Sequence, residues 1–302
     1  MIQYIKRKDL DILKYDACIE NSVQSRIYGF SWYLDIVADH WDVLVLDDYE
    51  AVMPIPWKSK YGIKYVYPPF WLLELGIFSL EEKFDIQLFL KRLFDEFRFV
   101  ESRLNTDNKF DSPKGNSLVR EMQVLRLNED HDSVFKNYRK DRRKDLVKAN
   151  KLGLMEKWND NPEILITLFN NNVGKRTPFI VEKDYQNLLR LIKECIKNSV
   201  GDILSIYDNE SNLVASGFFL KHKNTVTILV SSTDFKNRNN GANTFLIDRA
   251  IYKYEKNFGV FNFGGSSMKS IAKYFLSFGA KTIPYKQIKY NNLSFLVKLF
   301  KR

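Results

Sequence analysis

The chain has 302 residues, of which 45% are hydrophobic and 15% aromatic, so it can bury one large core or two ordinary ones and is not a disordered chain. The formal net charge of +10 favours anionic partners, such as nucleic acid, phosphorylated cofactors, acidic glycans or a membrane surface. Two distant cysteines and three scattered histidines exclude a disulfide framework and provide no metal-ligand spacing, so we expect no metal.

The N-terminus predicts a protein that is not exported. Residues 1–10, MIQYIKRKDL, lack the apolar core of a signal peptide. The longest apolar stretch, residues 65–78, is interrupted by Pro68, Pro69 and Glu74 and is too short to span a bilayer. We therefore expect a cytoplasmic protein, and a peripheral contact with the inner face of a membrane is compatible with this expectation.

The first part of the chain, residues 1–128, alternates apolar runs with turn formers. Asp47-Asp48-Tyr49 separates two apolar runs and is typical of a hairpin turn. In chain order, the expected elements are a helix capped by Ser31, strands over 41–46, 50–57 and 63–67, a helix over 82–97 and a strand over 123–127.

The second part, residues 129–302, repeats a similar order of helix, hairpin, strand and helix. This repetition predicts an α/β (α+β) protein built from two copies of one plan. Residues 281–302 carry six cations and no acid. The expected elements are helices from Asp132 or Ser133 to about Lys151, over 163–170 and over 182–197, strands over 202–207, 213–220 and 225–231, a helix over 240–257, a strand over 260–265 and a helix that ends at Phe278-Gly279.

One predicted helix, within residues 135–150, carries an arginine on its apolar face. Tyr138, Leu146 and Ala149 fall on one side of a helical wheel, and Arg142 lies in the middle of that side. A buried guanidinium needs acceptors, so Arg142 is a candidate for binding a carboxylate or a phosphate. The alternative is a long side chain that passes the core to reach water. The other cations of this helix form either a solvated face or a surface for a polyanion.

Two turns in the second part can bind an anionic ligand. The first follows the strand over 225–231, where backbone N–H groups at the start of the next helix can face a phosphate. The second follows the strand over 260–265, where paired glycines allow close approach of a ligand or another backbone. Each turn also serves as an ordinary connection. Their residues are Arg238, Asn239, Asn240, Gly241, Ala242 and Asn243 in the first, and Gly264, Gly265 and Ser266 in the second.

Three titratable side chains lie on the elements around these turns. Asp234 follows the first strand, and Tyr274 and Tyr285 follow the glycine pair. A carboxylate and a phenol in one cleft can take a proton from an amine and return one to a leaving group. These roles require the two strands that precede the turns to spread apart and leave space beside Gly241, and we expect them to do so.

In this order, the elements resemble the GNAT acyltransferase superfamily. The turn of that superfamily reads Gln or Arg, x, x, Gly, x, Gly or Ala and holds the pyrophosphate of coenzyme A. Here RNNGAN, residues 238–243, keeps the Arg and the first Gly of this pattern and has Asn243 at the last position. The resemblance implies an acyl-CoA co-substrate and predicts that Arg238 to Asn243 bind it.

More specifically, the chain is similar to the Fem-like branch, which fuses two GNAT-type domains and uses aminoacyl-tRNA to extend peptidoglycan precursors. The similarity predicts two tandem domains, 1–128 and 129–302, each with a mixed, largely antiparallel sheet flanked by helices. It rests on VMPIPWKSKYGIKYVYPPF, on YRKDRRKDLVKANKLGL with Arg142, on GKRTPF with Arg176, on FNFGGSS with Asn262 where the family has Asp, and on IAKYFLSFGA.

One position departs from the resemblance. Four residues before Gly279 the Fem pattern has Lys and many GNATs have Tyr, whereas this chain has Phe275. Phe275 cannot act as an acid, and its neighbour Tyr274 points about 100° away on a helix. Either the acid comes from another residue, or positioning and oxyanion stabilisation suffice, or activity is lost.

From these features we expect an N-acyltransferase that acts on an amine of a cell-envelope or polysaccharide precursor. Acyl-CoA is the favoured donor because of the turn at Arg238 and the loss of Lys at position 275, and aminoacyl-tRNA is the alternative. Arg142 and Arg176 are expected to bind anionic groups, Asn262 and the glycine pair to flank the acyl group, Asp234 to act as base, and Tyr274 or Tyr285 as acid. A different class is a catalytically inactive GNAT pair that binds RNA or an anionic glycan.

Overall fold

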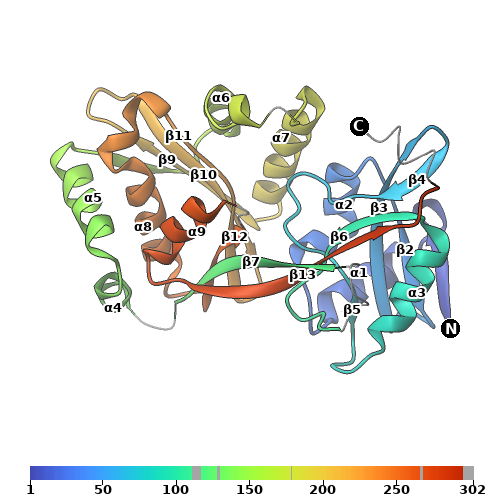
Figure 1. Cartoon of the computed structure of the whole chain (residues 1–302). Helices are drawn as coiled ribbons and strands as arrows, with labels where there is room; N and C mark the ends of the chain where they lie inside the picture. Colours follow the sequence, from blue (N-terminus) through green and yellow to red (C-terminus); the bar gives the residue numbers. More distant parts are fainter. Residues whose placement is uncertain (111–116, 128–129, 178, 266–267, 295–302) are drawn as a thin grey trace. The chain divides into compact units, whose positions relative to one another are not determined.

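The computed structural model describes residues 1–110, 117–127, 130–177, 179–265 and 268–294. Its internal contacts divide the chain into two compact units (Figure 1), a first unit of Met1–Arg120 with Pro284–Arg302 and a second unit of Glu121–Ile283. The sequence prediction placed a single boundary after residue 128, whereas the contacts group the end of the chain with the first unit.

The first unit is a mostly antiparallel sheet with the strand order β1-β2-β3-β4-β6-β13, and β5 pairs with β3. β4 and β6 are parallel neighbours, paired at Val66↔Val100. Its elements are β1 (Ile2–Lys6), η1 (Arg7–Asp9), α1 (Ile12–Asn21), η2 (Ile27–Gly29), α2 (Ser31–Val37), β2 (His40–Leu46), β3 (Ala51–Lys60), β4 (Ile63–Val66), β5 (Phe78–Ser79), α3 (Ile86–Glu96), β6 (Phe99–Arg103) and most of β13 (Lys281–Asn291).

The second unit repeats this plan, with the strand order β7-β12-β11-β10-β9-β8. Antiparallel hairpins join β9 to β10 and β10 to β11, and β8 pairs antiparallel with β9 at the edge. After β11 a helix leads to β12, which is parallel to β11. The elements are β7 (Ser117–Arg126), α4 (His131–Lys136), α5 (Lys140–Lys151), β8 (Met155–Trp158), α6 (Pro162–Asn171), η3 (Gly174–Arg176), α7 (Glu182–Lys197), β9 (Gly201–Tyr207), β10 (Leu213–His222), β11 (Thr225–Thr233), η4 (Phe235–Asn240), α8 (Ala242–Tyr254), β12 (Val260–Gly265) and α9 (Lys269–Leu276).

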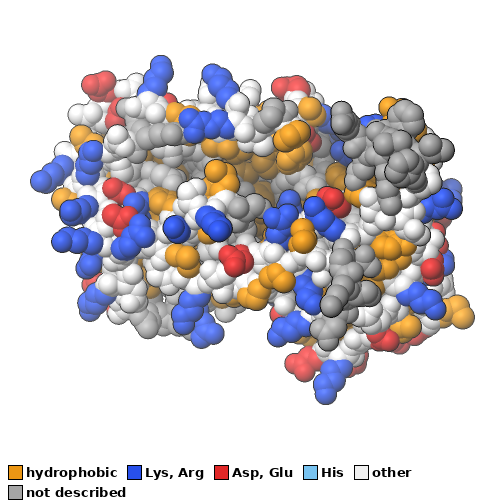
Figure 2. Space-filling model, viewed as in Figure 1, with side chains coloured by type: hydrophobic (Ala, Val, Ile, Leu, Met, Phe, Trp, Pro, Cys, Tyr) orange, Lys and Arg blue, Asp and Glu red, His pale blue; other side chains and the backbone are white. Residues whose placement is uncertain are grey.

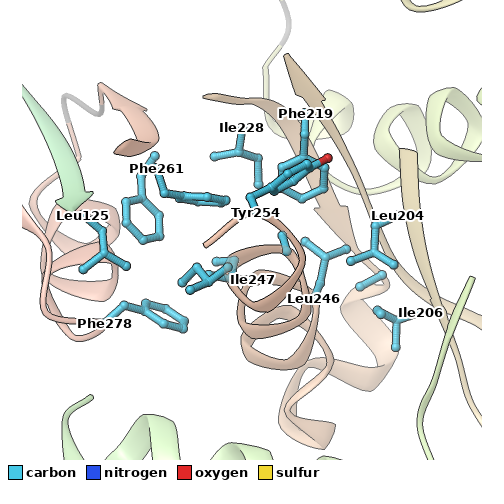
Figure 3. Packing of buried hydrophobic residues seen from close by; sticks show 14 of the residues in the cluster. Leu125, Leu204, Ile206, Phe219, Ile228, Leu246, Ile247, Tyr254, Phe261 and Phe278 are labelled. Atoms are coloured by element: carbon cyan, nitrogen blue, oxygen red, sulfur yellow. The ribbon is translucent and has the colours of Figure 1, made fainter. Parts of the chain in front are cut away.

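The helix α8 is the centre of the core of the second unit. Figure 3 shows its side chains Leu246, Ile247 and Tyr254 packed among residues of the neighbouring strands, and all three are buried. Phe261 of β12 and Phe278, which follows α9, close the same cluster. Burial of one large apolar side chain contributes about 2 kcal/mol, so this cluster, more than any single polar contact, fixes α8 and the turn before it.

The helices and strands predicted for the second unit occur in the expected order, although β8 was not predicted and one predicted helix is divided. The expected helix from Asp132 to Lys151 is interrupted between α4 and α5. Arg139 has an extended backbone (ψ 149°), and its N–H donates to the carbonyl of Ser277 at 2.8 Å. The interruption lets the ring of Tyr138 pack edge-on against Phe278 with ring centroids 5.1 Å apart. A tertiary contact therefore outweighs the local helix signal.

Smaller differences occur elsewhere. The helix predicted over 82–97 begins at Ile86, because the side chain of Asp85 accepts a hydrogen bond from the Gln87 N–H and caps the helix there. Ser31 is the first residue of α2 and not its cap, since the N-cap position is occupied by Phe30. The sequence did not indicate the helix α1 or the strands β1, β5, β6, β8 and β13.

Candidate functional site

Two neighbouring parallel strands of the second unit separate after a short paired segment. β11 and β12 pair at three positions, the last of which is Thr227↔Asn262. Just beyond it, a register shift against β10 makes Leu229 an extra residue on β11, and a second shift against β7 lies between Asn262 and Gly265 on β12. Bulges bend a strand and increase its twist, which explains why the pairing ends here. The expected early end of the pairing between the two strands is confirmed, and the expected space beside Gly241 stays a prediction.

The start of α8 lies against the backbone of α5. Gly241 is its N-cap with φ 82°, and a Cβ atom at this position would lie 2.4 Å from the carbonyl oxygen of Asp145. Gly241 and Ala242 are buried, and the Ala242 N–H already donates to Oδ1 of Asn240 at 2.9 Å. Gly241 is therefore required for the contact between the two helices. This contact covers part of the turn that the sequence predicted to hold phosphates.

The other members of the predicted turn differ in accessibility. Asn239 is exposed and Asn243 is half-buried, so both can meet a ligand. The side chain of Arg238 lies outside the described part of the structure. The predicted phosphate-binding role of the turn stays a prediction, and Asn239 and Asn243 are the members best placed for it.

Arg142 joins a polar cluster beside this turn. Its Nη1 atom lies 2.9 Å from both Oγ1 of Thr244 and Oδ2 of Asp145, and its Nη2 lies 3.2 Å from Oδ2 of Asp141. The guanidinium also stacks on the ring of Tyr274, with Cζ 4.6 Å from the ring centroid. The side chain is 13% exposed, and its buried Nε has no hydrogen-bond partner. The Nε–H group of Arg142 is thus a hydrogen-bond donor without an acceptor, on a side chain that is nearly buried.

Tyr274 is connected to a carboxylate through Thr244. The Thr244 hydroxyl donates to Oδ2 of Asp145 at 2.9 Å and lies 3.2 Å from Oη of Tyr274. Because the carboxylate can only accept, the chain of hydrogen bonds runs from the Tyr274 phenol to Thr244 and on to Asp145. Burial raises the pKa of Tyr274, and the hydrogen bond with Thr244 and the charge of Arg142 oppose this shift. Tyr274 is therefore a neutral phenol at pH 7 and can donate a proton.

Phe275, at the position where the resembled families have Lys or Tyr, belongs to an aromatic cluster. Its ring stacks on Phe263 of β12 with centroids 4.9 Å apart, and Phe263 also lies beside Phe278. The departure from the family pattern thus replaces a polar side chain with packing between α9 and β12. The neighbouring residue on α9, Tyr274, lies against Arg142 and Thr244.

Gln123 on β7 is buried without hydrogen bonds. It is fully buried, yet neither its Oε1 nor its Nε2 has a partner. The register places it opposite the bulge of β12, between Met122↔Gly265 and Val124↔Asn262. Buried polar groups in native proteins nearly always find a partner, so this amide marks a position where a ligand or an ordered water completes the structure.

A pocket of about 730 Å³ lies on the other side of β11, between α6 and η4. Asp234 lines it as the N-cap of η4, where its side chain accepts from the Lys236 N–H. Lys175 also lines the pocket, and its neighbour Arg176 stacks on Phe235 with Cζ 4.0 Å from the ring centroid. Arg176 thus contacts the residue that follows Asp234, and neither belongs to the cluster of Arg142 and Tyr274.

The remaining predicted residues have other surroundings. Asn262 is buried and supports the bulge, because its Oδ1 accepts from the Gly264 N–H at 2.8 Å and Gly264 has φ 74°. Gly265 is exposed, and Ser266 lies outside the described residues. Tyr285 belongs to the first unit, where burial raises its pKa and Arg103 opposes the shift.

Sequence reasoning missed three members of the site. In the sequence, Asp145 lies in a basic helix, Thr244 in a helix of ordinary composition, and Gln123 in a strand with apolar neighbours. The signal available for Gln123 was a long amide between apolar neighbours in a strand, where a polar side chain needs a partner. No comparable signal identifies Thr244, because its contact depends on how α5 and α8 pack.

No group of three or more His, Cys, Asp or Glu side chains in the described ranges is arranged to hold a metal ion. None of the helices described here has the length and apolar character needed to cross a lipid bilayer.

No protein-family model matches the chain, and a search of curated proteins by sequence finds no match. Solved structures do match over nearly the whole length. FemX covers 99% of this chain and 100% of its own, with a TM-score of 0.68 at 10% identity. The match to L-PGS from Bacillus licheniformis covers 96% of this chain and 95% of that protein, with a TM-score of 0.57 at 12% identity. The match to a tandem GNAT protein from the clavulanic acid biosynthesis pathway covers 96% of this chain and 97% of that protein, with a TM-score of 0.54 at 8% identity.

These likenesses, together with the repeated plan of the two units, show that the chain has a Fem-like tandem GNAT fold. The predicted fold class is confirmed.

Proposed function

We propose that this protein is an N-acyltransferase that moves an acyl group from an activated donor to an amine of a cell-envelope or polysaccharide precursor. The observation that carries the proposal is the separation of β11 from β12 after Thr227↔Asn262. Among the described residues, β11 has no β12 partner beyond this point, and an extended ligand with amide groups can pair with such a strand edge. The pantetheine arm of coenzyme A has this character. The fold shared with FemX and a tandem GNAT protein supports the same reading.

In the proposed reaction the amine attacks the acyl carbonyl and an amide bond forms as the bond to the leaving group breaks. The proton of the attacking amine is released to water, because Asp234 lines the α6 pocket and does not share the polar cluster of Tyr274. Tyr274 is the proposed acid, and it gives its proton to the departing thiolate. Thr244 and Asp145 hold the Tyr274 hydroxyl, and Arg142 balances the charge of Asp145. A general acid of this kind contributes roughly 100-fold or more to the rate.

The favoured donor is acyl-CoA, with Asn239 and Asn243 near its phosphates. A specific observation keeps aminoacyl-tRNA as the second candidate. Gly241 and Ala242 are buried against α5, and the Ala242 N–H is already bound. A pyrophosphate therefore finds fewer free backbone donors at this turn than the sequence indicated, whereas an aminoacyl ester does not need them.

The test is binding of acetyl-CoA and of charged tRNA to the same protein by calorimetry, followed by a thiol-release assay with a panel of amino sugars and peptide amines. We expect Tyr274→Phe to lower kcat about 100-fold and to leave the Kd for acetyl-CoA within about two-fold. The control is Tyr252→Phe, because Tyr252 is 50% exposed on α8.

Binding of charged tRNA without acetyl-CoA would replace the favoured donor with the second candidate. Failure of both donors to bind would reject the transferase proposal and leave the catalytically inactive GNAT pair as the reading.

A further inference from the structure

The exposed face of α5 is a stripe of cations, which we call the α5 face. Its positions follow the spacing i, i+3, i+4, i+8 and i+11, so they lie on one side of the helix. Figure 2 shows Lys and Arg side chains gathered over the part of the surface where Figure 1 draws α5. All five are exposed, and among the described residues none forms an ion pair: Lys140, Arg143, Lys144, Lys148 and Lys151.

The α5 face is not purely polar. Val147 lies in the middle of the cationic stripe and is 54% exposed. Leu152 and Met155, just after the helix, are 43% and 51% exposed. The opposite side of α5 is anchored in the core by Leu146 and Ala149, so the cations and the exposed apolar side chains are held in place by the fold.

We propose that the α5 face docks the protein on an anionic lipid bilayer. A helix that lies on a membrane combines cations, which pair with lipid phosphates, with apolar side chains that enter the acyl boundary. The α5 face has both features, and its long Lys and Arg side chains can reach phosphates while Val147 is inserted.

An RNA is the other polyanion to consider, and the composition of the α5 face speaks against it. Single-stranded RNA is bound through aromatic rings that stack on the bases, and residues 140–151 contain no aromatic side chain. An RNA backbone gains nothing from exposed Val147 and Leu152, whereas a bilayer does. This proposal does not depend on which acyl donor the protein uses, or on whether it is an enzyme.

The experiment is co-sedimentation of the full chain with vesicles of phosphatidylcholine alone and of phosphatidylcholine with about 30% phosphatidylglycerol. We expect binding to the anionic vesicles only, and weaker binding as salt rises from about 0.1 M to about 0.5 M. Lys144→Glu with Lys148→Glu should lower the partition coefficient about 30-fold or more, because two cations are lost and two repulsive charges are added. Val147→Ser should lower it about three-fold.

The matched control reverses two exposed lysines of the first unit, Lys83→Glu with Lys91→Glu, and changes the net charge equally. Equal losses in the two double variants would show that net charge alone drives binding and would overturn the proposal. The proposal would also be overturned if the protein bound tRNA through Lys144 and Lys148 but did not bind anionic vesicles. The Kd of each variant for acetyl-CoA, measured in parallel, separates failure of membrane docking from failure of the proposed transferase activity.

Discussion

Two partly buried arginines, one in each unit, differ in how completely their donors are hydrogen-bonded. In the first unit, Arg26 donates from Nε to Glu74 at 2.9 Å and from Nη2 to Asp107 at 2.8 Å, while its Nη1 meets two backbone carbonyls. In the second unit, Nε of Arg142 and the whole side-chain amide of Gln123 are buried without partners. Nε of Arg92 in the first unit also lacks a partner, so the comparison applies to Arg26 and Arg142 and not to every polar side chain. A guanidinium whose donors are all bonded holds a structure together, whereas one with an unbonded donor can also bind a ligand.

The connection between strand and helix also differs. In the first unit, residues 67–85 join β4 to α3, and a side-chain cap from Asp85 completes the start of the helix. In the second unit, residues 234–241 join β11 to α8, and Gly241 caps the helix without a side chain. The shorter connection places the start of α8 directly after the strand that separates from its neighbour. The same plan therefore has a much shorter connection between strand and helix in the second unit than in the first.

The largest expected effect is on the saturated arginine. Arg26→Met leaves the carboxylate of Glu74, whose side chain is 4% exposed, without its cation and should lower the free energy of unfolding by about 3–5 kcal/mol. Arg142→Met should lower it by only about 1–2 kcal/mol, because Asp141 and Asp145 are more exposed. Urea unfolding followed by circular dichroism measures both. Equal losses of unfolding free energy in the two variants would show that Arg142 stabilises the fold as much as Arg26 does.

The next effect compares two glycines with similar backbone angles. Gly241 has φ 82° and Gly62 has φ 76°, but a Cβ at Gly62 meets no atom within 4 Å, whereas one at Gly241 lies 2.4 Å from the Asp145 carbonyl. Gly62→Ala should cost about 1 kcal/mol from backbone strain alone. Gly241→Ala should cost about 3 kcal/mol, because α5 and α8 must also move apart. Similar thermal shifts for the two variants would show that the helices are not tightly packed at Gly241.

A smaller effect, with opposite signs in the two units, concerns the two buried glutamines. Oε1 of Gln24 accepts from the Ser79 N–H at 2.9 Å, so Gln24→Leu should destabilise the fold by about 1–2 kcal/mol. Gln123 has no such bond, so Gln123→Leu should stabilise it by about 1 kcal/mol and weaken ligand binding. Thermal denaturation with and without acetyl-CoA measures both consequences. Destabilisation by Gln123→Leu would indicate that an ordered water already satisfies the amide.

Much of the second unit was predictable because its signals are local. Turn formers between apolar runs located the hairpins of β9, β10 and β11, and a Gly-containing turn located the start of α8. The break between α4 and α5 was not predictable, because it depends on a hydrogen bond from Arg139 to Ser277 across more than a hundred residues. The strand β13 was missed since its many lysines hide a segment that pairs with β6.

The candidate site was predictable only in part. Arg142 was found from its place on an apolar helix face, and its contacts agree with that expectation of a guanidinium that needs acceptors. Its partner Thr244 could not be found, because nothing in a helix of ordinary composition marks one threonine. Asp234 and Tyr274 were predicted as a pair, whereas the contacts of Asp234 lie with η4 and the α6 pocket and those of Tyr274 with α5 and α8. Sequence identifies residues suited to chemistry, and packing decides which of them share a site.

The smallest expected effect is a pH dependence that belongs to the second unit. Nε2 of His131 lies 2.8 Å from Oδ1 of buried Asp248, and this hydrogen bond raises the pKa of His131, while burial opposes the shift. A raised pKa in the folded state means that the contribution to stability is complete below the unfolded value, about 6.5, and is lost as pH rises through the folded value. The free energy of unfolding should therefore fall by up to about 1 kcal/mol between about pH 6 and pH 9. His131→Gln should remove this slope. If the slope survives in His131→Gln, another group of the protein titrates in this range and the contact with Asp248 is not its source.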